Sequence, residues 1–356
     1  MVDTNNKKQT ILIVDDVAEN LYTLMNILRD EYTILVATSG AKALALASDQ
    51  PQPDLILLDI KMPDMNGYEV CDLLKHNPLT QHIPVIFVTV LSDIDDEAKG
   101  LYLGSVDYIS KPVIPNLLKA RIRNHLELKT HRDHLQSLVD HRTYELKLVK
   151  EATVEAMGIV AEGRDPETGG HVQRTKAYVR LLAEGLAQLS KFQEVLTPRK
   201  IEKMFMAAPL HDIGKVTISD LILLKPGKLT YEEFETMKTH AMAGEETIRK
   251  VQGRFTDIPF LGVAEEIAGG HHEKWDGSGY PRGLAGENIP IAARVMALAD
   301  VYDALISKRS YKGAIDHAEV VEMIKADSGK HFDPDVVDVF LANASKFQEI
   351  VDTVLD

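Results

Sequence analysis

The sequence has little cysteine and no excess of basic residues, and both absences limit what the protein can be. One cysteine, Cys71, among 356 residues excludes an intramolecular disulfide and a metal site built from several thiolates. The formal net charge of -14 lacks the basic footprint of a general nucleic-acid binder. No helix-turn-helix with basic recognition residues follows the first half of the chain, so we expect no direct DNA binding.

Long apolar runs are missing as well. No stretch approaches the ~20 apolar residues that span a bilayer, and residues 1–8 lack the apolar core of a secretory signal. We therefore expect no membrane contact and a cytoplasmic location, where a lone cysteine stays reduced. With 45% hydrophobic and 26% charged residues, the chain has a globular composition, and its length fits two or three domains of roughly 100–200 residues.

The first part of the chain, residues 1–125, alternates short β-rich apolar runs with amphipathic stretches such as 20–30 and 41–48. This pattern is typical of a parallel α/β sheet. The runs are nearly continuous in apolar residues, as expected where helices cover both faces of the sheet. The expected strands are Thr10–Val14, Thr33–Ala37, Asp54–Leu58, Pro84–Thr89 and Val106–Ile109.

Residues 115–163 form an almost unbroken helical pattern. A partial heptad spacing joins Leu128, Leu135 and Val149, but polar residues interrupt it. Two interpretations remain open: a solvated connecting helix, or a dimeric coiled coil that transmits a signal. We take residues 126–150 as a helical linker, and the strand-free pattern that follows predicts an all-α domain over residues 151–356.

Polar side chains stand where the predicted strands of the first domain end. Asp15 and Asp16 follow the first strand and Asp59 the third, while Thr89 closes the fourth and Lys111 lies just beyond the fifth. Ligands of open α/β sheets bind at this edge. Carboxylates gathered there need a hard cation such as Mg²⁺, beside which one of them can attack a phosphoryl group to form an aspartyl-phosphate. Each residue alone is more simply a cap or a strand residue, but all five in one pattern favour a site.

Residues 8–125 resemble the receiver domain of bacterial two-component response regulators. The motifs that carry the resemblance are Ile-Val-Asp-Asp (13–16), Leu-Leu-Asp-Ile-Lys-Met-Pro-Asp-Met-Asn-Gly (57–67) and Ser-Lys-Pro (110–112). The resemblance implies a flavodoxin-like, doubly wound fold with five parallel strands. It also implies phosphorylation by a sensor histidine kinase.

Residue roles follow from the same resemblance. It implies that Asp59 is the phosphoacceptor and that it binds Mg²⁺ together with Asp15 and Asp16. The residues implied in switching are the hydroxyl of Thr89, the rotameric ring of Tyr108 and the phosphate-contacting Lys111. The peptide bond that follows this lysine, before Pro112, is often cis in the family.

The second half holds a series of histidines and carboxylates. Imidazole together with carboxylate suits first-row transition metals such as iron and manganese. Taken singly, each of these residues is more often a packing or surface side chain, but together they outnumber the ligands of one ion. Two or three ions with shared ligands fit better, and clustered ions can clamp the attacking and leaving oxygens of a phosphoryl displacement. The candidates are Glu167, His171, His211, Asp212, His240, His271, His272 and Asp300.

Residues 150–345 closely resemble the HD-GYP subgroup of the HD phosphohydrolase superfamily. Five motifs in the expected order carry the resemblance: Arg164–His171, His211–Lys215, His271–Pro281, Ala299–Leu305 and Arg309–Lys312. The resemblance implies hydrolysis of cyclic di-GMP to pGpG, with GMP left open as a final product. It also implies two or three bound ions, with iron or manganese as the usual metals.

The metal ligands of that subgroup carry over onto the candidates given above. Asp212 is expected to bridge ions, and Glu167 matches the extra carboxylate of members that hold three metals, so we expect a trinuclear site. The expected core set is His171, His211, Asp212 and Asp300. The expected ligands of a second ion are His240, His271 and His272.

Further residues are expected to act on the substrate. Lys215 lies one helical turn beyond His211 by the i,i+4 relation, and we count it with Asp212 as catalytic because it can stabilise the phosphate or the leaving group. Tyr280 suits a phosphate hydrogen bond or stacking near a guanine, and Asp303 is a weaker candidate for support of a ligand or substrate contact. The expected phosphate-binding cations are Arg309 and Lys312.

The domain order predicts a response regulator whose receiver controls a metal phosphodiesterase through the connecting helix, and we expect a homodimer. Two alternatives remain. The substrate could be a related cyclic dinucleotide such as cyclic GMP-AMP, because nothing in the motifs distinguishes the bases. The helical half could instead be a non-catalytic adaptor that binds a nucleotide or a partner protein, although its complete ligand set argues against this.

Overall fold

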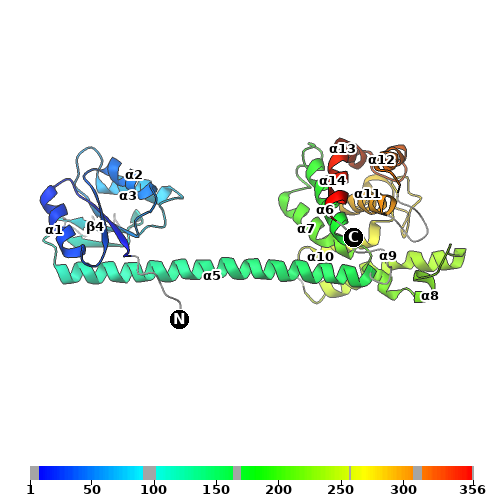
Figure 1. The fold of residues 1–356 in the computed structure, drawn as a ribbon, viewed down its shortest axis with the longest axis horizontal. Coiled ribbons are helices and arrows are strands. Elements are labelled where there is room, and N and C mark those ends of the chain that lie inside the picture. The colour runs from blue at the N-terminus through cyan, green and yellow to red at the C-terminus, as the bar shows by residue number, and fades with distance from the viewer. Residues whose placement is uncertain (1–7, 91–101, 163–169, 256–257, 308–314, 355–356) are drawn as a thin grey trace. The chain divides into compact units, whose positions relative to one another are not determined.

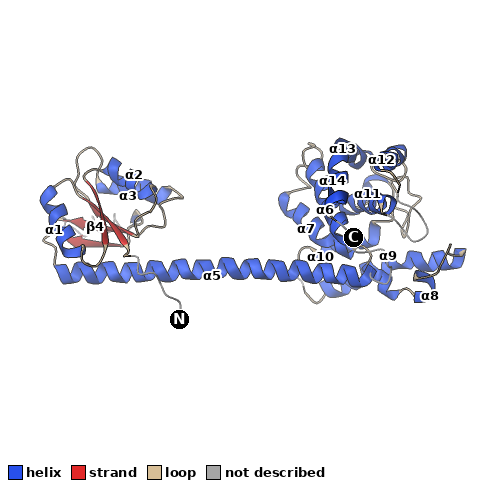
Figure 2. Ribbon diagram, viewed as in Figure 1, coloured by secondary structure: helices blue, strands red, loops and turns tan. Residues whose placement is uncertain are grey.

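The computed structural model describes residues 8–90, 102–162, 170–255, 258–307 and 315–354. The chain divides into two compact units, Met1–Thr143 and Tyr144–Asp356. In the described parts of the chain, all strands belong to the first unit, and helices build the second (Figures 1 and 2). Within those same parts, no helix combines the length and apolar character that crossing a bilayer requires.

The first unit contains a five-stranded sheet in the order β2-β1-β3-β4-β5, with parallel pairing throughout. Val14 pairs with both Ala37 and Leu58, and Thr89 pairs with Ser110, so the carboxyl ends of the strands meet at one edge. The predicted doubly wound, flavodoxin-like fold is confirmed, with strand bounds within one residue of the predicted ones. The strands are β1 (Thr10–Val14), β2 (Thr33–Ala37), β3 (Leu55–Asp59), β4 (Val85–Thr89) and β5 (Asp107–Ser110).

Helices cover both faces of this sheet because its central strands are apolar on both faces. Successive side chains of a strand point to opposite sides, so Leu12 and Val14 pack toward α2 and α3, whereas Ile11 and Ile13 pack toward α1 and α5. The helices described in this unit are α1 (Ala18–Leu28), α2 (Gly40–Ser48), α3 (Gly67–His76) and the first turns of α5 (Pro115–Glu162).

The loop between β3 and α3 fixes the end of the strand that carries Asp59. Asn66 caps α3 by accepting a hydrogen bond from the backbone of Glu69, whose carboxylate accepts one from the backbone of Asn66 in return. A Cβ atom at Gly67 would lie 2.3 Å from the carbonyl oxygen of Asp59. Glycine is therefore required here, because only its bare Cα lets the helix start this close to the strand end.

The long helix α5 confirms the predicted connecting helix. Its first turns belong to the core of the first unit, where Leu118 and Ile122 are fully buried. Further along, Leu135 and Val149 expose 61% and 62% of their surface. Apolar side chains in this stretch therefore lie in solvent in the isolated chain, and either interpretation of the helix stays open. The helix ends at Glu162, which is buried again.

The second unit packs its helices around one apolar core, as predicted for an all-α domain. At its centre the rings of Tyr178 and Phe347 stack 4.8 Å apart, and Tyr302 meets Tyr178 edge to face at 5.1 Å. Two of these elements, α6 and α11, supply His171, Asp300 and Asp303 to the site described below. The helices are α6 (His171–Leu186), α7 (Pro198–Ala207), α8 (Asp220–Leu223), α9 (Tyr231–Gln252), α10 (Leu261–Gly270), α11 (Ile291–Ile306), α12 (His317–Ala326), α13 (Pro334–Ala342) and α14 (Ala344–Thr353).

Candidate metal centre

The predicted ligands of the second unit converge from elements that lie far apart along the chain. The turn that carries two of them runs between the short 3₁₀ segments η1 (Ala208–Leu210) and η2 (Ile213–Thr217). The ligands and their positions are His171 at the start of α6, His211 and Asp212 between η1 and η2, His240 on α9, His271 and His272 directly after α10, and Asp300 on α11.

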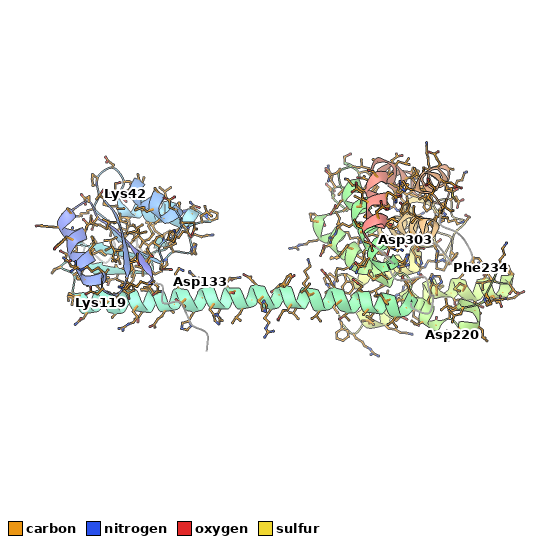
Figure 3. All side chains as sticks on the ribbon, in the orientation of Figure 1. Lys42, Lys119, Asp133, Asp220, Phe234 and Asp303 are labelled. Atoms are coloured by element: carbon orange, nitrogen blue, oxygen red, sulfur yellow. The ribbon has the colours of Figure 1, made fainter. Side chains whose placement is uncertain are left out.

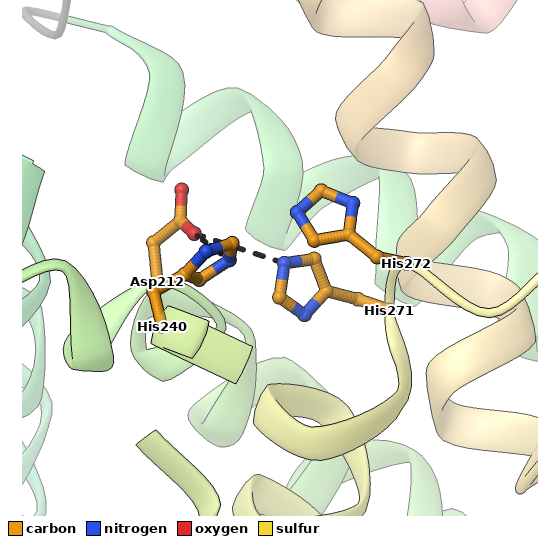
Figure 4. A group of neighbouring side chains, drawn as sticks. All are labelled: Asp212, His240, His271 and His272. Atoms are coloured by element: carbon orange, nitrogen blue, oxygen red, sulfur yellow. Dashed lines mark ion pairs between the residues drawn. The ribbon is translucent and has the colours of Figure 1, made fainter. Parts of the chain in front are cut away.

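Asp212 contacts two groups of side chains, and Figure 4 shows one of them, with His240, His271 and His272. Its Oδ1 atom is 3.3 Å from Nε2 of His240 and 3.7 Å from Nε2 of His271. Its Oδ2 atom is 3.3 Å from Nε2 of His211 and 2.5 Å from Nζ of Lys215. The two oxygens of one buried carboxylate therefore face different partners, which is the arrangement that a ligand shared between two ions requires.

Three of the histidines are oriented by their own helices. Each holds its Nδ1 atom against a backbone carbonyl, which can only accept, so Nδ1 donates and, in the neutral ring that binds metal, Nε2 carries the free electron pair. The Nε2 atoms of His211, His240 and His271 are buried and have no hydrogen-bond partner in the described part of the chain. The distances from Nδ1 to the backbone carbonyl oxygen are 2.9 Å for His211 and Ala208, 2.7 Å for His240 and Met237, and 3.0 Å for His271 and Ile267. Metal-ligating histidines are oriented in this way.

A carboxylate orients the fourth histidine. Asp303, on α11 inside the helical unit (Figure 3), accepts a hydrogen bond of 2.7 Å from Nδ1 of His171. Arg174 holds the same carboxylate with hydrogen bonds of 2.7 and 3.1 Å. Because Asp303 is only 1% exposed and is already paired in this way, its position favours support of His171 over contact with a substrate.

A second group of ligand atoms includes a residue that the sequence analysis did not select. Oε1 of Glu162 lies 3.6 Å from Nε2 of His171 and 3.7 Å from Nε2 of His211. Oδ1 of Asp300 lies 3.7 and 3.9 Å from the same two nitrogens. A glutamate at the end of a mostly solvated helix carries no sequence signal, and only the packing of α5 shows that this side chain points inward.

The donor atoms fit transition-metal ions. Ligand atoms about 2.0–2.2 Å from a shared ion stand about 3.0–3.6 Å apart at bond angles of about 90–120°. The separations of 3.3 to 3.9 Å in the two groups are close to this range. Buried imidazole nitrogens and carboxylate oxygens without hydrogen bonds are stabilised when an ion takes the missing place. The site therefore has the character of a centre for more than one ion.

The electrostatics of the two groups differ. Burial lowers the pKa of His240 to about 4 and that of His272 well below its ordinary value, so both rings are neutral, the form that binds metal. Burial also opposes the charge on His211, but the neighbouring Asp212 and Asp300 outweigh it and raise the pKa to about 10. Lys215 and His211 hold the pKa of Asp212 well below its ordinary value, against the effect of its own burial.

Lys215 lies beside the candidate ligands, but its backbone does not have the predicted α-helical geometry. It lies in the 3₁₀ segment η2 and pairs with Asp212 at i,i+3, whereas an α-helical i,i+4 relation to His211 was expected. Its side chain remains 24% exposed, so the ammonium group is held beside the ligands and is still open to solvent.

The Gly-Tyr-Pro loop places Tyr280 next to the ligands. Its ring centroid lies 4.7 Å from that of His272, and its backbone N–H donates to the carbonyl of the same histidine at 3.2 Å. Glu273 is 2% exposed and accepts hydrogen bonds from the backbone N–H groups of Arg282 and Leu284, at 2.7 and 3.0 Å. This buried glutamate ties the loop together, and the sequence analysis had treated it as an ordinary motif residue.

Three predicted site residues cannot be placed. They lie outside the residues that the structure describes and remain predictions from the sequence: Glu167, Arg309 and Lys312.

The first unit gathers its predicted acidic residues at the carboxyl edge of the sheet. Ligand oxygens of Asp15, Asp16 and Asp59 lie within 4.8 Å of one another. Nζ of Lys111 donates to Asp15 at 2.8 Å and to Asp59 at 2.7 Å. Thr89 ends the neighbouring strand and is 4% exposed. Two of the three carboxylates are buried, and in the described part of the chain Lys111 is the cation that contacts them, so a divalent cation fits this pocket.

Burial and ion pairing act in opposite directions on the pKa values of Asp59 and Lys111 in this pocket. Burial raises the pKa of Asp59, although Lys111 acts in the opposite direction. Burial alone would lower the pKa of Lys111, but its hydrogen bonds to Asp15 and Asp59 raise it. The peptide bond between Lys111 and Pro112 is cis, and Tyr108 is half-buried on β5 beside the pocket.

A flavodoxin-like unit with an acidic pocket, joined to a helical unit with a buried His/Asp cluster that fits metal ions, defines a response regulator with a helical output domain. Comparison with known families agrees: residues 11–123 match the response regulator receiver domain, and residues 159–336 match the HD domain. The chain belongs to the family of response regulators that join a receiver domain to an HD domain and that includes cyclic di-GMP phosphodiesterases.

Three relatives illustrate the family. A probable cyclic di-GMP phosphodiesterase of Vibrio cholerae is 50% identical over 98% of this chain and 80% of its own length. The cyclic di-GMP phosphodiesterase response regulator RpfG of Xanthomonas campestris is 36% identical over 96% of this chain and 89% of its own length. The 3'3'-cGAMP-specific phosphodiesterase 2 of Vibrio cholerae is 40% identical over 57% of this chain and 36% of its own length.

Proposed function

We propose that the protein hydrolyses cyclic di-GMP to pGpG in its helical unit, under the control of the receiver unit. The observation that carries the proposal is the position of Asp212, whose two carboxylate oxygens face separate sets of buried imidazole nitrogens. The substrate assignment is supported by the relative named as a probable cyclic di-GMP phosphodiesterase, which is 50% identical over 98% of this chain.

The ligands divide into two sets that share Asp212. When bound, iron or manganese ions would supply Lewis-acid activation of a phosphoryl oxygen and of water. Glu167, predicted to be an additional ligand, would complete a site for a third ion. The first set is His171, His211, Asp212 and Asp300, and the second set is Asp212, His240, His271 and His272.

Two side chains beside the ligands would bind the scissile phosphate. Lys215 is held by Asp212 and partly exposed, so its ammonium group can neutralise charge that develops on a phosphate oxygen or on the leaving group. Burial raises the pKa of Tyr280, so its hydroxyl stays protonated and can donate a hydrogen bond to a phosphate. Arg309 and Lys312 are proposed as further phosphate contacts on the strength of the motif alone.

The enzymatic proposal is tested with the full chain, loaded with manganese and incubated with cyclic di-GMP, with the products separated by chromatography. We expect pGpG, and prolonged incubation will show whether GMP follows. Asp212→Asn should lower the rate by at least about 100-fold, because the shared ligand is lost, whereas His134→Asn, on the exposed part of α5, should not. A manganese-loaded wild-type protein that leaves cyclic di-GMP intact would refute the proposal and favour the adaptor alternative.

A second substrate is supported by one observation. A relative named as specific for 3'3'-cGAMP matches 57% of this chain at 40% identity, below the 50% of the cyclic di-GMP relative. Hydrolysis of the two cyclic dinucleotides side by side decides between them. We expect a higher kcat/KM for cyclic di-GMP, and a higher value for the mixed dinucleotide would reverse the assignment.

We propose that Asp59 accepts a phosphoryl group from a sensor histidine kinase, with Mg²⁺ held by Asp15, Asp16 and Asp59. The proposal is supported by the clustering of these oxygens and by Lys111, which already contacts two of them. Incubation with acetyl phosphate and Mg²⁺ should add one phosphoryl group to the wild type and none to Asp59→Asn. Control of the output is tested by comparing hydrolysis rates with and without beryllofluoride, and equal rates would contradict it.

We propose a homodimer formed through the exposed stretch of α5. Its support is the apolar surface of Leu128, Leu135 and Val149, which are 64%, 61% and 62% exposed in the single chain. Sedimentation equilibrium should give the mass of a dimer. The double variant Leu135→Glu, Val149→Glu should be monomeric, and a monomeric wild type would contradict the proposal.

A further inference from the structure

We infer that Glu162 is a further metal ligand of the helical unit, supplied by the last turn of α5. The inference rests on the proposed function for the presence of the ions, but it concerns a residue outside the predicted ligand set. It assigns to the group around His171 and His211 a carboxylate in addition to that of Asp300.

The first argument is burial without a partner. Glu162 is 3% exposed, and neither carboxylate oxygen has a hydrogen-bond partner among the described residues. A buried carboxylate that accepts no hydrogen bond is strongly unfavourable. Buried carboxylates elsewhere in this unit are paired: Asp303 accepts from Arg174 and His171, and Glu273 accepts from two backbone N–H groups. Asp212 also has one oxygen without a hydrogen bond, but its other oxygen pairs with Lys215, whereas both oxygens of Glu162 lack a partner among the described residues. A bound cation explains this.

The second argument is the position of Oε1. It lies 3.6 Å from Nε2 of His171 and 3.7 Å from Nε2 of His211. Both rings are held at their other nitrogen, by Asp303 and by the carbonyl of Ala208, so both present Nε2 to the same place. Oδ1 of Asp300 lies 3.7 Å from Nε2 of His171 and 3.9 Å from Nε2 of His211. Ligand atoms of Glu162, His171 and His211 therefore all lie within 4.8 Å of one another.

An ion pair with protonated histidines is the simpler alternative, and the distances argue against it. Where a carboxylate in this site does pair with a histidine, as Asp303 does with His171, the atoms approach to 2.7 Å. Oε1 of Glu162 lies 3.6 and 3.7 Å from the two nitrogens, beyond the limit of about 3.2 Å for such a hydrogen bond. These separations are close to those of ligand atoms around one ion.

The consequence concerns α5. This helix begins in the core of the first unit, where Leu118 is fully buried, and it ends at Glu162. A displacement of its last turn would withdraw a ligand, so the affinity for one ion depends on how this turn is held.

The test compares Glu162→Gln with wild type in the full chain, using Mn²⁺ alone as the probe. After chelation and dialysis, free Mn²⁺ is titrated by electron paramagnetic resonance, and bound manganese is counted by elemental analysis. We expect Glu162→Gln to lose one ion or to bind it at least about 10-fold more weakly. Glu151→Gln, a partly exposed glutamate on the same helix, is the matched control and should bind like the wild type.

The thermal stability of the metal-free proteins distinguishes a metal ligand at Glu162 from a structural ion pair at the same position. A ligand without other partners gains nothing from its charge in the metal-free state, so metal-free Glu162→Gln should be at least as stable as metal-free wild type. Lower stability of the metal-free variant with unchanged Mn²⁺ binding would show a structural ion pair and overturn the inference. If Glu162→Gln does not fold, Glu162→Asp is measured instead, and unchanged Mn²⁺ binding again overturns it. Because no nucleotide is used, failure of the wild type to hydrolyse cyclic di-GMP would refute the proposed function without affecting this result.

Discussion

Asp303 accepts a hydrogen bond of 2.7 Å from Nδ1 of His171, although the two residues lie on helices far apart in the chain. The bond fixes which nitrogen carries the proton and turns the free electron pair of Nε2 toward Glu162 and Asp300. Arg174 anchors the carboxylate from its other side. One buried aspartate thus sets both the tautomer and the direction of a proposed ligand.

Replacing Asp303 by asparagine should weaken metal binding without removing a ligand. The amide can still contact His171, but it no longer fixes the tautomer, and loss of such a contact typically costs about 10–100-fold in metal affinity. Titration with Mn²⁺ measures the effect, and the exposed Asp338→Asn on α13 serves as the control. Equal affinities of Asp303→Asn and wild type would contradict the assigned role.

The same substitution should show a defined pH dependence of stability in the metal-free protein. Burial favours the protonated form of Asp303, but hydrogen bonds from His171 and Arg174 outweigh it and lower the pKa of the carboxyl. Its contribution to stability is therefore full above the unfolded pKa of about 3.9 and is lost as the pH falls through the folded value.

Urea unfolding of the two metal-free proteins measures this contribution. We expect Asp303→Asn to cost about 3–5 kcal/mol at pH 7, because the buried Arg174 loses the carboxylate charge of Asp303. The difference from wild type should shrink below about pH 4. A difference that stays constant between pH 7 and pH 3 would contradict the linkage.

Gly214→Ala should disturb the site through the backbone. A Cβ atom at this position would lie 1.9 Å from the carbonyl oxygen of His240, so η2 and α9 must move apart. We expect a loss of about 1–3 kcal/mol or more in unfolding free energy and weaker Mn²⁺ binding, because Asp212 and His240 sit on the separated elements. Gly253→Ala, where the nearest atom lies at 3.5 Å, should be close to neutral in both measurements.

Lys215→Met should lower kcat for cyclic di-GMP while the metal content stays unchanged. The ammonium group contacts Asp212 and remains partly exposed, so its main contribution is expected in the transition state, worth about 100- to 1,000-fold in rate. Lys346→Met, an exposed lysine on α14, is the control. A change confined to KM would assign Lys215 to ground-state binding instead.

Cys71 should react with thiol reagents only when the first unit opens. It is 0% exposed, and burial raises the pKa of its thiol to about 11. At pH 8 about 0.1% of this thiol is ionised, whereas a free cysteine with a pKa of about 8.5 is about one-quarter ionised. Labelling with a disulfide reagent should be slow in buffer and fast in urea. Immediate stoichiometric labelling of the folded protein would contradict the burial.

The carboxyl edge of the receiver could be predicted from sequence because strand order and side-chain period are local properties. A run such as Thr10–Val14 predicts a buried strand, and parallel pairing brings the residues that follow each strand to one edge. Asp15, Asp16 and Asp59 were therefore expected together, and the structure places their oxygens within 4.8 Å of one another. The strand bounds shifted by a residue because hydrogen bonding, not hydrophobicity, ends a strand.

The helical site was only partly predictable. The motif residues His211, Asp212 and His271 were selected correctly as neighbours, but by resemblance, since helices far apart in sequence meet in ways that no period encodes. The i,i+4 relation assumed for Lys215 was wrong because the chain adopts a 3₁₀ turn there, which packs Gly214 against α9.

The sequence by itself determined the two kinds of domain and the acidic edge of the sheet, because these follow from hydrophobic pattern and residue type. The candidate imidazoles of the helical half came from the family motifs. Tertiary structure alone decided which carboxylates face those imidazoles. Glu162 looks like an ordinary helical acid in sequence and Asp303 was only a weaker candidate, and both are part of the site because packing buries them beside His171. Burial removes water from a charge, and the charge must then find its partner in three dimensions.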